Sequence, residues 1–340
     1  MKKFCKKSQK STPLQASAEV FSFGEPVPVM DKMDILNYLS CSVQCSKWYD
    51  PPVAWSSLAK SLRASTHHES AITVKANLLA DTCEITRPDV LSRKALVALI
   101  KDYYIFGNAY LSRVENRLGK LIRLESPLAK YVRKGVEEGR YFYLQQGLDA
   151  VEFERNSVLH LLEPDVNQDI YGLPQYLSAL QSAWLNENAT LFRRKYYLNG
   201  AHAGFVFYMT DTAQKQEDID NLRTQLRKSK GVGNFQNLFV HAPNGKKDGI
   251  QIIPIADVAA KDEFFNIKNV SRDDVLAAHR VPPQLMGIIP SNTGGFGDVE
   301  KAAKVFLAIE IAPMQERLKE INHWLGFELI RFKPSSLLSE

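Results

Sequence analysis

Cysteine and histidine are the residue types in this chain whose spacing comes nearest to a metal-binding site. Cys41 and Cys45 lie four residues apart, which would place both thiols on one face of a helix, and His67 and His68 are remote candidates for further ligands. The cysteines, however, have irregular intervals and form no CxxC pair. We therefore expect reduced, partly buried thiols in a reducing compartment, and no metal.

Acidic pairs and the other histidines are the next candidates for chemistry. Adjacent acids, as at 137–138 and 273–274, are typical of a solvated helix face or turn. His160, His241 and His279 have apolar neighbours in the sequence, which favours structural roles. None of these groups predicts a catalytic residue.

Nucleotide-binding and hydrolase motifs do not occur. The phosphate loops GxxxxGKS and GxxxxGKT are absent, as are GxSxG and HExxH. The segment GGFGD, residues 294–298, lacks the preceding strand that a dinucleotide-binding turn requires. We expect no enzyme and no cofactor. A nucleotide- or metal-dependent enzyme stays as an alternative that would need a phosphate loop or a ligand cluster.

The net charge is distributed unevenly along the chain. Its formal net charge is +5, and the five lysines within residues 2–10 account for all of it. A protein that grips duplex DNA tightly usually has a net basic surface. The neutral remainder argues against a second alternative, a DNA-binding regulator, and leaves room for a loose contact with DNA.

A few exposed charges are expected at turns and helix ends. The end of a predicted helix carries Arg227, Lys228 and Lys230, where cations also complement the helix dipole. A hairpin tip carries Asn244, Lys246 and Lys247, and a charge at such a tip is displayed rather than used for folding.

The first half of the chain predicts helices followed by short strands. Residues 1–30 predict a mobile basic arm, and helices are expected at 31–39, 55–64, 68–80 and 88–106, the last opened by Pro88 and Asp89 and closed by Gly107. Alternating segments at 108–115, 120–126, 130–135, 140–146 and 157–163 predict antiparallel strands. This order predicts an α+β domain that ends near residue 163.

The second half predicts long helices around an inserted unit. A helix at 174–198 has Leu177, Trp184, Leu191 and Leu198 at seven-residue intervals, so it must pack on another helix. Residues 204–255 predict a compact α+β insertion, followed by a helix at 259–279. The glycine-rich segment 287–297 predicts a loop, and a final helix from Asp298 should be kinked at Pro313. No apolar run is long enough for a membrane span, and no signal peptide precedes the body, which predicts a cytoplasmic protein.

Long ordered stretches of this sequence are similar to a known family. They include AAHRVPPQLMGIIPSNTGGFGDVEKAAKVF at 277–306, FSFGEPVPVMD at 21–31, FGNAYL at 106–111 and LLEPDVNQDIYGLPQYLSALQSA at 161–183. These segments resemble portal proteins of contractile-tailed temperate phages, the PBSX-type branch of phage portals. The resemblance covers nearly everything after residue 20.

The resemblance implies an α+β portal fold with an α/β wing, a two-helix stem, a small α+β clip insertion, a tunnel loop and a long kinked tunnel helix. The implied divisions are an arm at 1–30, the wing at 31–173, stem helices at 174–200 and 257–283, the clip at 201–256, the tunnel loop at 284–298, and the tunnel helix with a C-terminal wing or short crown at 299–340.

The resemblance also implies partners and sites. It implies a homo-oligomeric ring of about twelve subunits in the virion, assembled in the host cytoplasm, with double-stranded DNA in its channel and no membrane. Expected protein partners are the large and small terminase subunits, the major capsid and scaffold proteins, and neck or tail completion proteins. The loop facing DNA would be Ile288, Ile289, Pro290, Ser291, Asn292, Thr293, Gly294, Gly295, Phe296 and Gly297. The clip residues that dock terminase or neck proteins would be Arg227, Lys228, Lys230, Asn244, Lys246 and Lys247.

Overall fold

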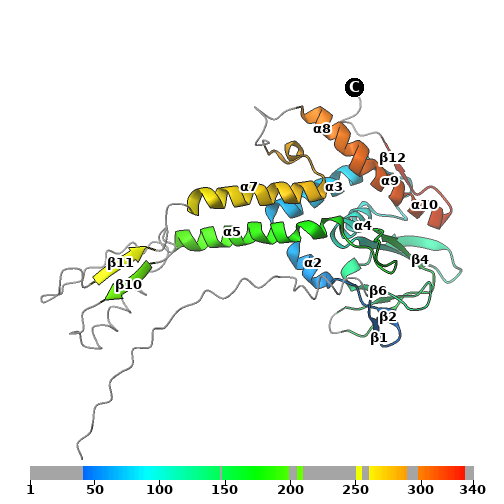
Figure 1. The fold of residues 1–340 in the computed structure, drawn as a ribbon. Coiled ribbons are helices and arrows are strands. Elements are labelled where there is room, and N and C mark those ends of the chain that lie inside the picture. The colour runs from blue at the N-terminus through cyan, green and yellow to red at the C-terminus, as the bar shows by residue number, and fades with distance from the viewer. Residues whose placement is uncertain are drawn as a thin grey trace, which may run out of the picture.

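The computed structural model describes residues 41–145, 148–198, 205–209, 250–254, 260–288 and 298–333. Figure 1 shows a body of helices and small sheets at one end, from which two long helices, α5 and α7, run side by side to a two-stranded unit at the other end. A C-terminal series of helices, α8 to α10, lies back across the body. The α+β class predicted from the sequence is confirmed.

Three helices form the first layer of the body: α2 (Trp55–Ser61), α3 (Thr66–Thr82) and α4 (Arg93–Phe106). The Ser92 hydroxyl caps α4 by accepting from the Ala95 N–H at 3.1 Å. The helix therefore begins later than the predicted start at residue 88. Val90 and Leu91, which precede the cap, are buried in a turn instead. At the other end Gly107 adopts φ 67° and stops the helix, as predicted.

The strands predicted for residues 108–163 are confirmed, and they form two antiparallel sheets. One sheet has the order β5-β4-β9, with β4 (Asn108–Glu115) between β5 (Leu121–Glu125) and β9 (Val158–Leu162). The other has the order β6-β7-β8, comprising β6 (Val132–Lys134), β7 (Tyr141–Tyr143) and β8 (Val151–Glu152). Before them lie β1 (Val43–Gln44) and β2 (Trp48–Tyr49), and the 3₁₀ turn η1 (Ala129–Tyr131) precedes β6.

The long helix pair begins at the body with a tighter turn than predicted. Residues after Pro174 form a 3₁₀ helix, η2 (Gln175–Ala179), before α5 (Leu180–Leu198) begins, and α7 (Ala260–His279) returns beside it. Small residues let the two helices approach closely: Ala179, Ala183 and Val275 form one buried cluster. The distal unit pairs β10 (Phe205–Met209) with β11 (Ile250–Pro254) in antiparallel register.

The predicted heptad stripe on α5 is only partly buried within the subunit. Trp184 lies in the core, whereas Leu191 is 50% exposed. The body covers the start of α5, and α7 covers one further side of it. The expectation that this helix packs on another helix is confirmed by α7, but one partner does not cover the whole stripe.

The C-terminal helices form one interrupted rod. Asp298 caps α8 (Val299–Phe306), as predicted, by accepting from the Lys301 N–H at 2.9 Å. A π-helical turn, η4 (Leu307–Ile311), follows, and then α9 (Ala312–Leu318) and α10 (Glu320–Leu325). Pro313 has no N–H to donate, so the regular α-helical hydrogen bonding is interrupted in the turn before it. This explains the interruption predicted at Pro313.

The end of the described chain closes the body. Strand β12 (Ile330–Phe332) pairs antiparallel with β3 (Cys83–Ile85), directly after α3. The larger core lies between α3, α4, β4 and the C-terminal helices, and includes Leu79, Ile100, Phe306 and Ile311. A second core surrounds Trp55, Tyr110 and Tyr171. No helix in the described ranges is long and apolar enough to cross a membrane.

Candidate functional site

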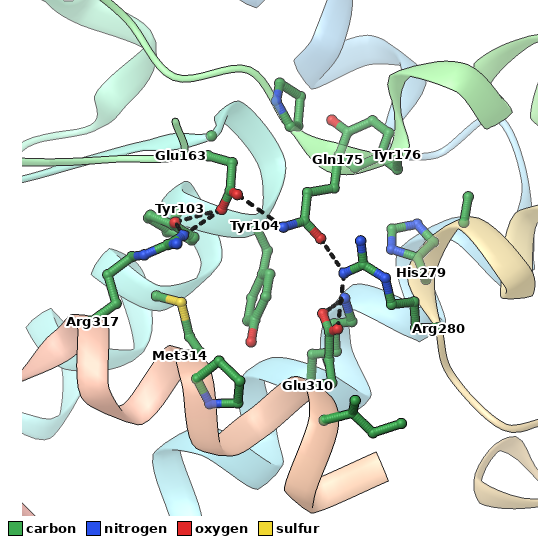
Figure 2. Close-up of a pocket in the computed structure, with 16 residues that line it drawn as sticks. Tyr103, Tyr104, Glu163, Gln175, Tyr176, His279, Arg280, Glu310, Met314 and Arg317 are labelled. Atoms are coloured by element: carbon green, nitrogen blue, oxygen red, sulfur yellow. Dashed lines mark hydrogen bonds and ion pairs between the residues drawn. The ribbon is translucent and has the colours of Figure 1, made fainter. Parts of the chain in front are cut away.

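A polar cluster occupies the junction between the body, the long helix pair and the C-terminal helices (Figure 2). It surrounds a hollow of about 110 Å³. Side chains from six parts of the fold line it, namely α3, α4, the end of β9, η2, the end of α7 and the η4–α9 segment. Its charged and amide members are Lys75, Glu163, Gln175, Arg280, Glu310 and Arg317.

The centre of this junction is an ion pair between Lys75 and Glu310. The two side chains are only 4% and 8% exposed. Burial lowers the pKa of Lys75, and the charge of Glu310 opposes that shift. Glu310 also accepts from Arg280 Nη1 at 3.1 Å. One carboxylate therefore joins the π turn to both α3 and the end of α7.

The backbone at Arg280 directs its side chain toward this centre. Arg280 follows α7 with φ 54°, the left-handed region that a non-glycine residue adopts only at some cost. Its N–H donates to the Ala277 carbonyl at 3.0 Å, which closes the helix end. The chain then turns into Pro282 and the short 3₁₀ helix η3 (Pro283–Met286).

A second series of hydrogen bonds extends the network across the junction. Arg280 Nη1 donates to Gln175 Oε1 at 2.6 Å, and Gln175 Nε2 donates to Glu163 Oε1 at 2.9 Å. Glu163 Oε2 in turn accepts from the Tyr103 hydroxyl at 2.6 Å and from Arg317 Nη1 at 2.5 Å. Burial is the main influence on Glu163 and raises its pKa. The dashed lines in Figure 2 follow this continuous path from α3 to α9.

Two histidines lie beside the network. His68 Nδ1 and His279 Nε2 are 2.8 Å apart, and both rings contact Tyr176. Burial lowers the pKa of His68 to about 4 and that of His279 to about 2, so both rings are neutral at pH 7. The structural role expected for His279 agrees with this contact. His160, predicted to be structural as well, bonds Asn108 Oδ1 at 2.9 Å.

The metal alternative receives no support from the part of the chain that the structure describes. Cys41 Sγ lies 3.6 Å from Gln168 Oε1, and His68 contacts His279 rather than a thiol. No group of three or more metal-ligating side chains occurs among the described residues. His241 lies outside them.

The site residues expected from the sequence lie almost entirely outside the described residues. Residues 289–297 of the loop and the six clip residues fall in the ranges that the structure does not describe. Ile288 is described, and it is a half-buried residue that packs against the larger core.

Sequence reasoning missed the Lys75–Glu310 junction. A signal was present in α3, because Lys75 shares the spacing of Ile72, Ala76 and Leu79, which are all buried. A lysine on the apolar side of a helix needs a partner. The sequence gives no means of identifying that partner at residue 310.

The fold is that of a portal subunit. A chain in the virion of a native gene transfer agent particle matches it with a TM-score of 0.61 at 18% identity, over 89% of this chain and 88% of that chain. An HK97 family phage portal protein from Corynebacterium diphtheriae matches with a TM-score of 0.59 at 15% identity, over 82% of this chain and 96% of that chain.

Sequence comparisons identify the family. The family described as "Phage portal protein" matches residues 66–340. The probable portal protein of Escherichia phage P2 is 56% identical over 94% of this chain and 92% of its own length. That of Haemophilus phage HP1 is 38% identical over 80% of each. The chain belongs to the phage portal protein family, and its function is that of a portal. The finer PBSX-type assignment stays a prediction.

Proposed function

We propose that this chain forms a closed ring of about twelve copies at one capsid vertex, through which double-stranded DNA enters and leaves. The observation that carries the proposal is the described fold, a portal body from which a long helix pair leads to a separate distal unit. A solved relative of this fold belongs to the neck of a particle analysed with C12 symmetry. The interpretation as a ring follows from applying that arrangement to this chain.

Exposed apolar side chains support the ring. Leu185 on α5 and Val270 on α7 are 50% and 61% exposed, and Val305 and Ile309 on the C-terminal rod are 56% and 64% exposed. These large apolar residues on α5, α7 and the C-terminal rod stay exposed in a single subunit, and contact between copies would remove them from water. In a closed ring each copy uses two different surfaces, so we expect heterologous contacts.

The loop assigned to the DNA channel is residues 288–297. It contains no lysine, arginine, aspartate or glutamate. In a ring, one lysine in each copy would become a whole circle of charges, and even a few phosphate contacts give strong, salt-dependent binding. A loop without charged side chains makes no ionic contacts with the phosphates, so it would not hold the DNA in place.

The distal unit is proposed as the docking surface for terminase and neck proteins. It corresponds to the clip at 201–256, with Arg227, Lys228, Lys230, Asn244, Lys246 and Lys247 as its contact residues. The resemblance implies that a separate terminase ATPase supplies the work of packaging, and a chain without a phosphate-loop motif fits that division. The other partners proposed are the major capsid and scaffold proteins, and assembly would take place in the host cytoplasm.

Electron microscopy combined with native mass measurement tests the ring. We expect rings of about twelve copies from the purified protein at micromolar concentration, without nucleotide. Only monomers or dimers under those conditions would contradict the proposal. A DNA-binding regulator would instead shift duplex DNA in a binding assay without forming a ring with a central hole. A nucleotide-dependent enzyme would hydrolyse ATP in the absence of any other protein.

A further inference from the structure

A groove on the body is separate from the junction and is not used by the proposed channel. Its volume is about 600 Å³, and its lining comes from the β2–α2 connection, η1, β6 and the residues after β7. Two leucines line this groove: Leu148 is 68% exposed, and Leu144 is half-buried. A groove lined by partly exposed leucines is suited to an apolar segment.

The polar part of this groove carries one more cation than acid. The Arg133 guanidinium lies over the Trp55 ring, 4.8 Å from its centroid. Its Nε is buried without a hydrogen-bond partner, and the Asp50 carboxylate is 3.8 Å away. Among the described residues Lys130 contacts the Tyr131 ring and has no carboxylate partner. Two cations and one acid therefore leave the groove able to accept a further carboxylate.

The N-terminal part of the chain enters the body at this groove. The Asp50 N–H donates to the Ser42 carbonyl at 2.8 Å, and Asp50 itself lines the groove. The segment 21–31, FSFGEPVPVMD, ends eleven residues before Ser42. Eleven extended residues reach up to about 36 Å. A tether of this length keeps the segment at high effective concentration near the groove.

The chemistry of segment 21–31 matches the groove. It contains Phe21, Phe23, Val27, Val29 and Met30 as apolar side chains and Glu25 and Asp31 as its only charges. Proline fixes the φ angle of its own residue, so Pro26 and Pro28 lower the entropy that this segment would lose on docking. An apolar segment with two carboxylates is complementary to a groove lined by two leucines and two cations.

We propose that residues 21–31 dock in the groove of their own subunit, with Asp31 near Lys130. This anchors the base of the basic arm, residues 2–10, to the body. The proposal concerns an internal contact, so it stands or falls separately from the proposed ring and channel.

Disulfide trapping in the full-length protein tests the contact. We would introduce Val29→Cys with Leu148→Cys in a background where Cys5, Cys41 and Cys45 are serine, leaving the buried Cys83 in place. Oxidation should link residues 29 and 148 within one chain, seen as a reducible monomer band of altered mobility and confirmed by peptide mass spectrometry. The matched control pairs Val29→Cys with Val166→Cys, since Val166 is 98% exposed and does not line the groove. Equal linking to both positions, or links only between chains, would overturn the proposal.

A charge exchange provides a second measurement that needs no disulfide geometry. Lys130→Glu should speed cleavage within 21–31 by a dilute protease about tenfold, because the open state becomes more populated. Adding Asp31→Lys should restore most of the protection, whereas Lys101→Glu, an exposed change on α4, should have no effect. Unchanged cleavage in Lys130→Glu would contradict the contact, and ring formation measured in parallel would report separately on the proposed function.

Discussion

Glu310 and Lys75 are 235 residues apart in the sequence, yet their side chains form a buried ion pair between the π turn and α3. Arg280, at the end of α7, shares the same carboxylate. Helix α3, the end of α7 and the C-terminal rod therefore meet at a single acidic side chain. A displacement of α3 or of the end of α7 would have to break a charge-assisted contact with Glu310.

The first prediction concerns the cost of removing that acid. Glu310→Leu leaves the charge of Lys75 buried without its partner and should lower the free energy of unfolding by about 3–5 kcal/mol. Lys75→Met combined with Glu310→Leu should recover most of the loss, because neither charge of this pair then remains buried. Urea unfolding at fixed protein concentration measures both.

A matched control for this prediction is the exposed pair of Lys319 and Glu316, whose side chains are 42% and 71% exposed. Glu316→Leu should cost less than about 1 kcal/mol. If Glu310→Leu were no more costly than the control, the ion pair would not stabilise the junction.

The second prediction concerns Asp102, a buried residue of α4. It accepts from the Ala129 N–H at 2.8 Å, and burial raises its pKa to about 7. The folded protein thus binds a proton that the unfolded chain releases near pH 4, so stability should fall as pH rises from about 4 to about 7. Asp102→Asn should remove this part of the pH dependence, at most about 4 kcal/mol. An unchanged slope in thermal unfolding across this range would contradict it.

The third prediction has the opposite sign and concerns His68 and His279. Their pKa values are lowered to about 4 and about 2, so the unfolded chain binds protons that the folded protein excludes. Stability should be lost as pH falls from about 6.5 toward 4. His279→Gln should weaken that dependence, while His323→Gln, at an exposed position of α10, serves as the control. Equal slopes in the two variants would argue against the histidine pair as the source.

Local signals predicted much of the fold. Gly107 was identified as a helix end because glycine readily adopts a positive φ, and Asp298 as a cap because its carboxylate can reach the free N–H groups of the next turn. The start of α4 was wrong by five residues. Pro88 and Asp89 are also common at turns, and burial of Val90 and Leu91 there competed with helix formation.

Local sequence signals could not predict the polar junction around Lys75 and Glu310. Its central contact joins Lys75 to Glu310, 235 residues away. A lysine or a glutamate on a helix is typical of a solvated face when seen alone. The exposed Leu191 of the α5 stripe is a related case. The heptad spacing correctly required a partner, but spacing cannot distinguish α7 of the same subunit from a neighbouring copy.

A fourth prediction tests the proposed tunnel loop. Lysine at both Ser291 and Asn292 should permit ring and capsid assembly but slow DNA packaging, most strongly at low salt, because each subunit adds two phosphate-binding charges. Lysine at Leu118 and Val166, which are 91% and 98% exposed on the body, makes the same change in charge elsewhere. Packaging that matches the control at every ionic strength would show that the loop does not face DNA.

A fifth prediction tests the proposed clip. Lys246→Glu with Lys247→Glu should leave rings intact and reduce capture of terminase in a pull-down, because charges at a hairpin tip are displayed to a partner. The matched control, Lys101→Glu with Lys120→Glu, changes two exposed lysines of the body. Terminase capture that is equal in the two variants would remove Lys246 and Lys247 from the docking surface.

The pairing of β12 with β3 has a consequence for synthesis on the ribosome. Arg331 and Glu84, which form an ion pair across these strands, are 247 residues apart. At about 5–20 residues per second, β3 emerges roughly 12–50 s before its partner exists. Throughout that interval the edge of β3 and the core beneath the missing C-terminal helices stay uncovered. A nascent subunit should therefore depend on chaperone protection, and it cannot join other copies through a completed body until residue 332 has been made.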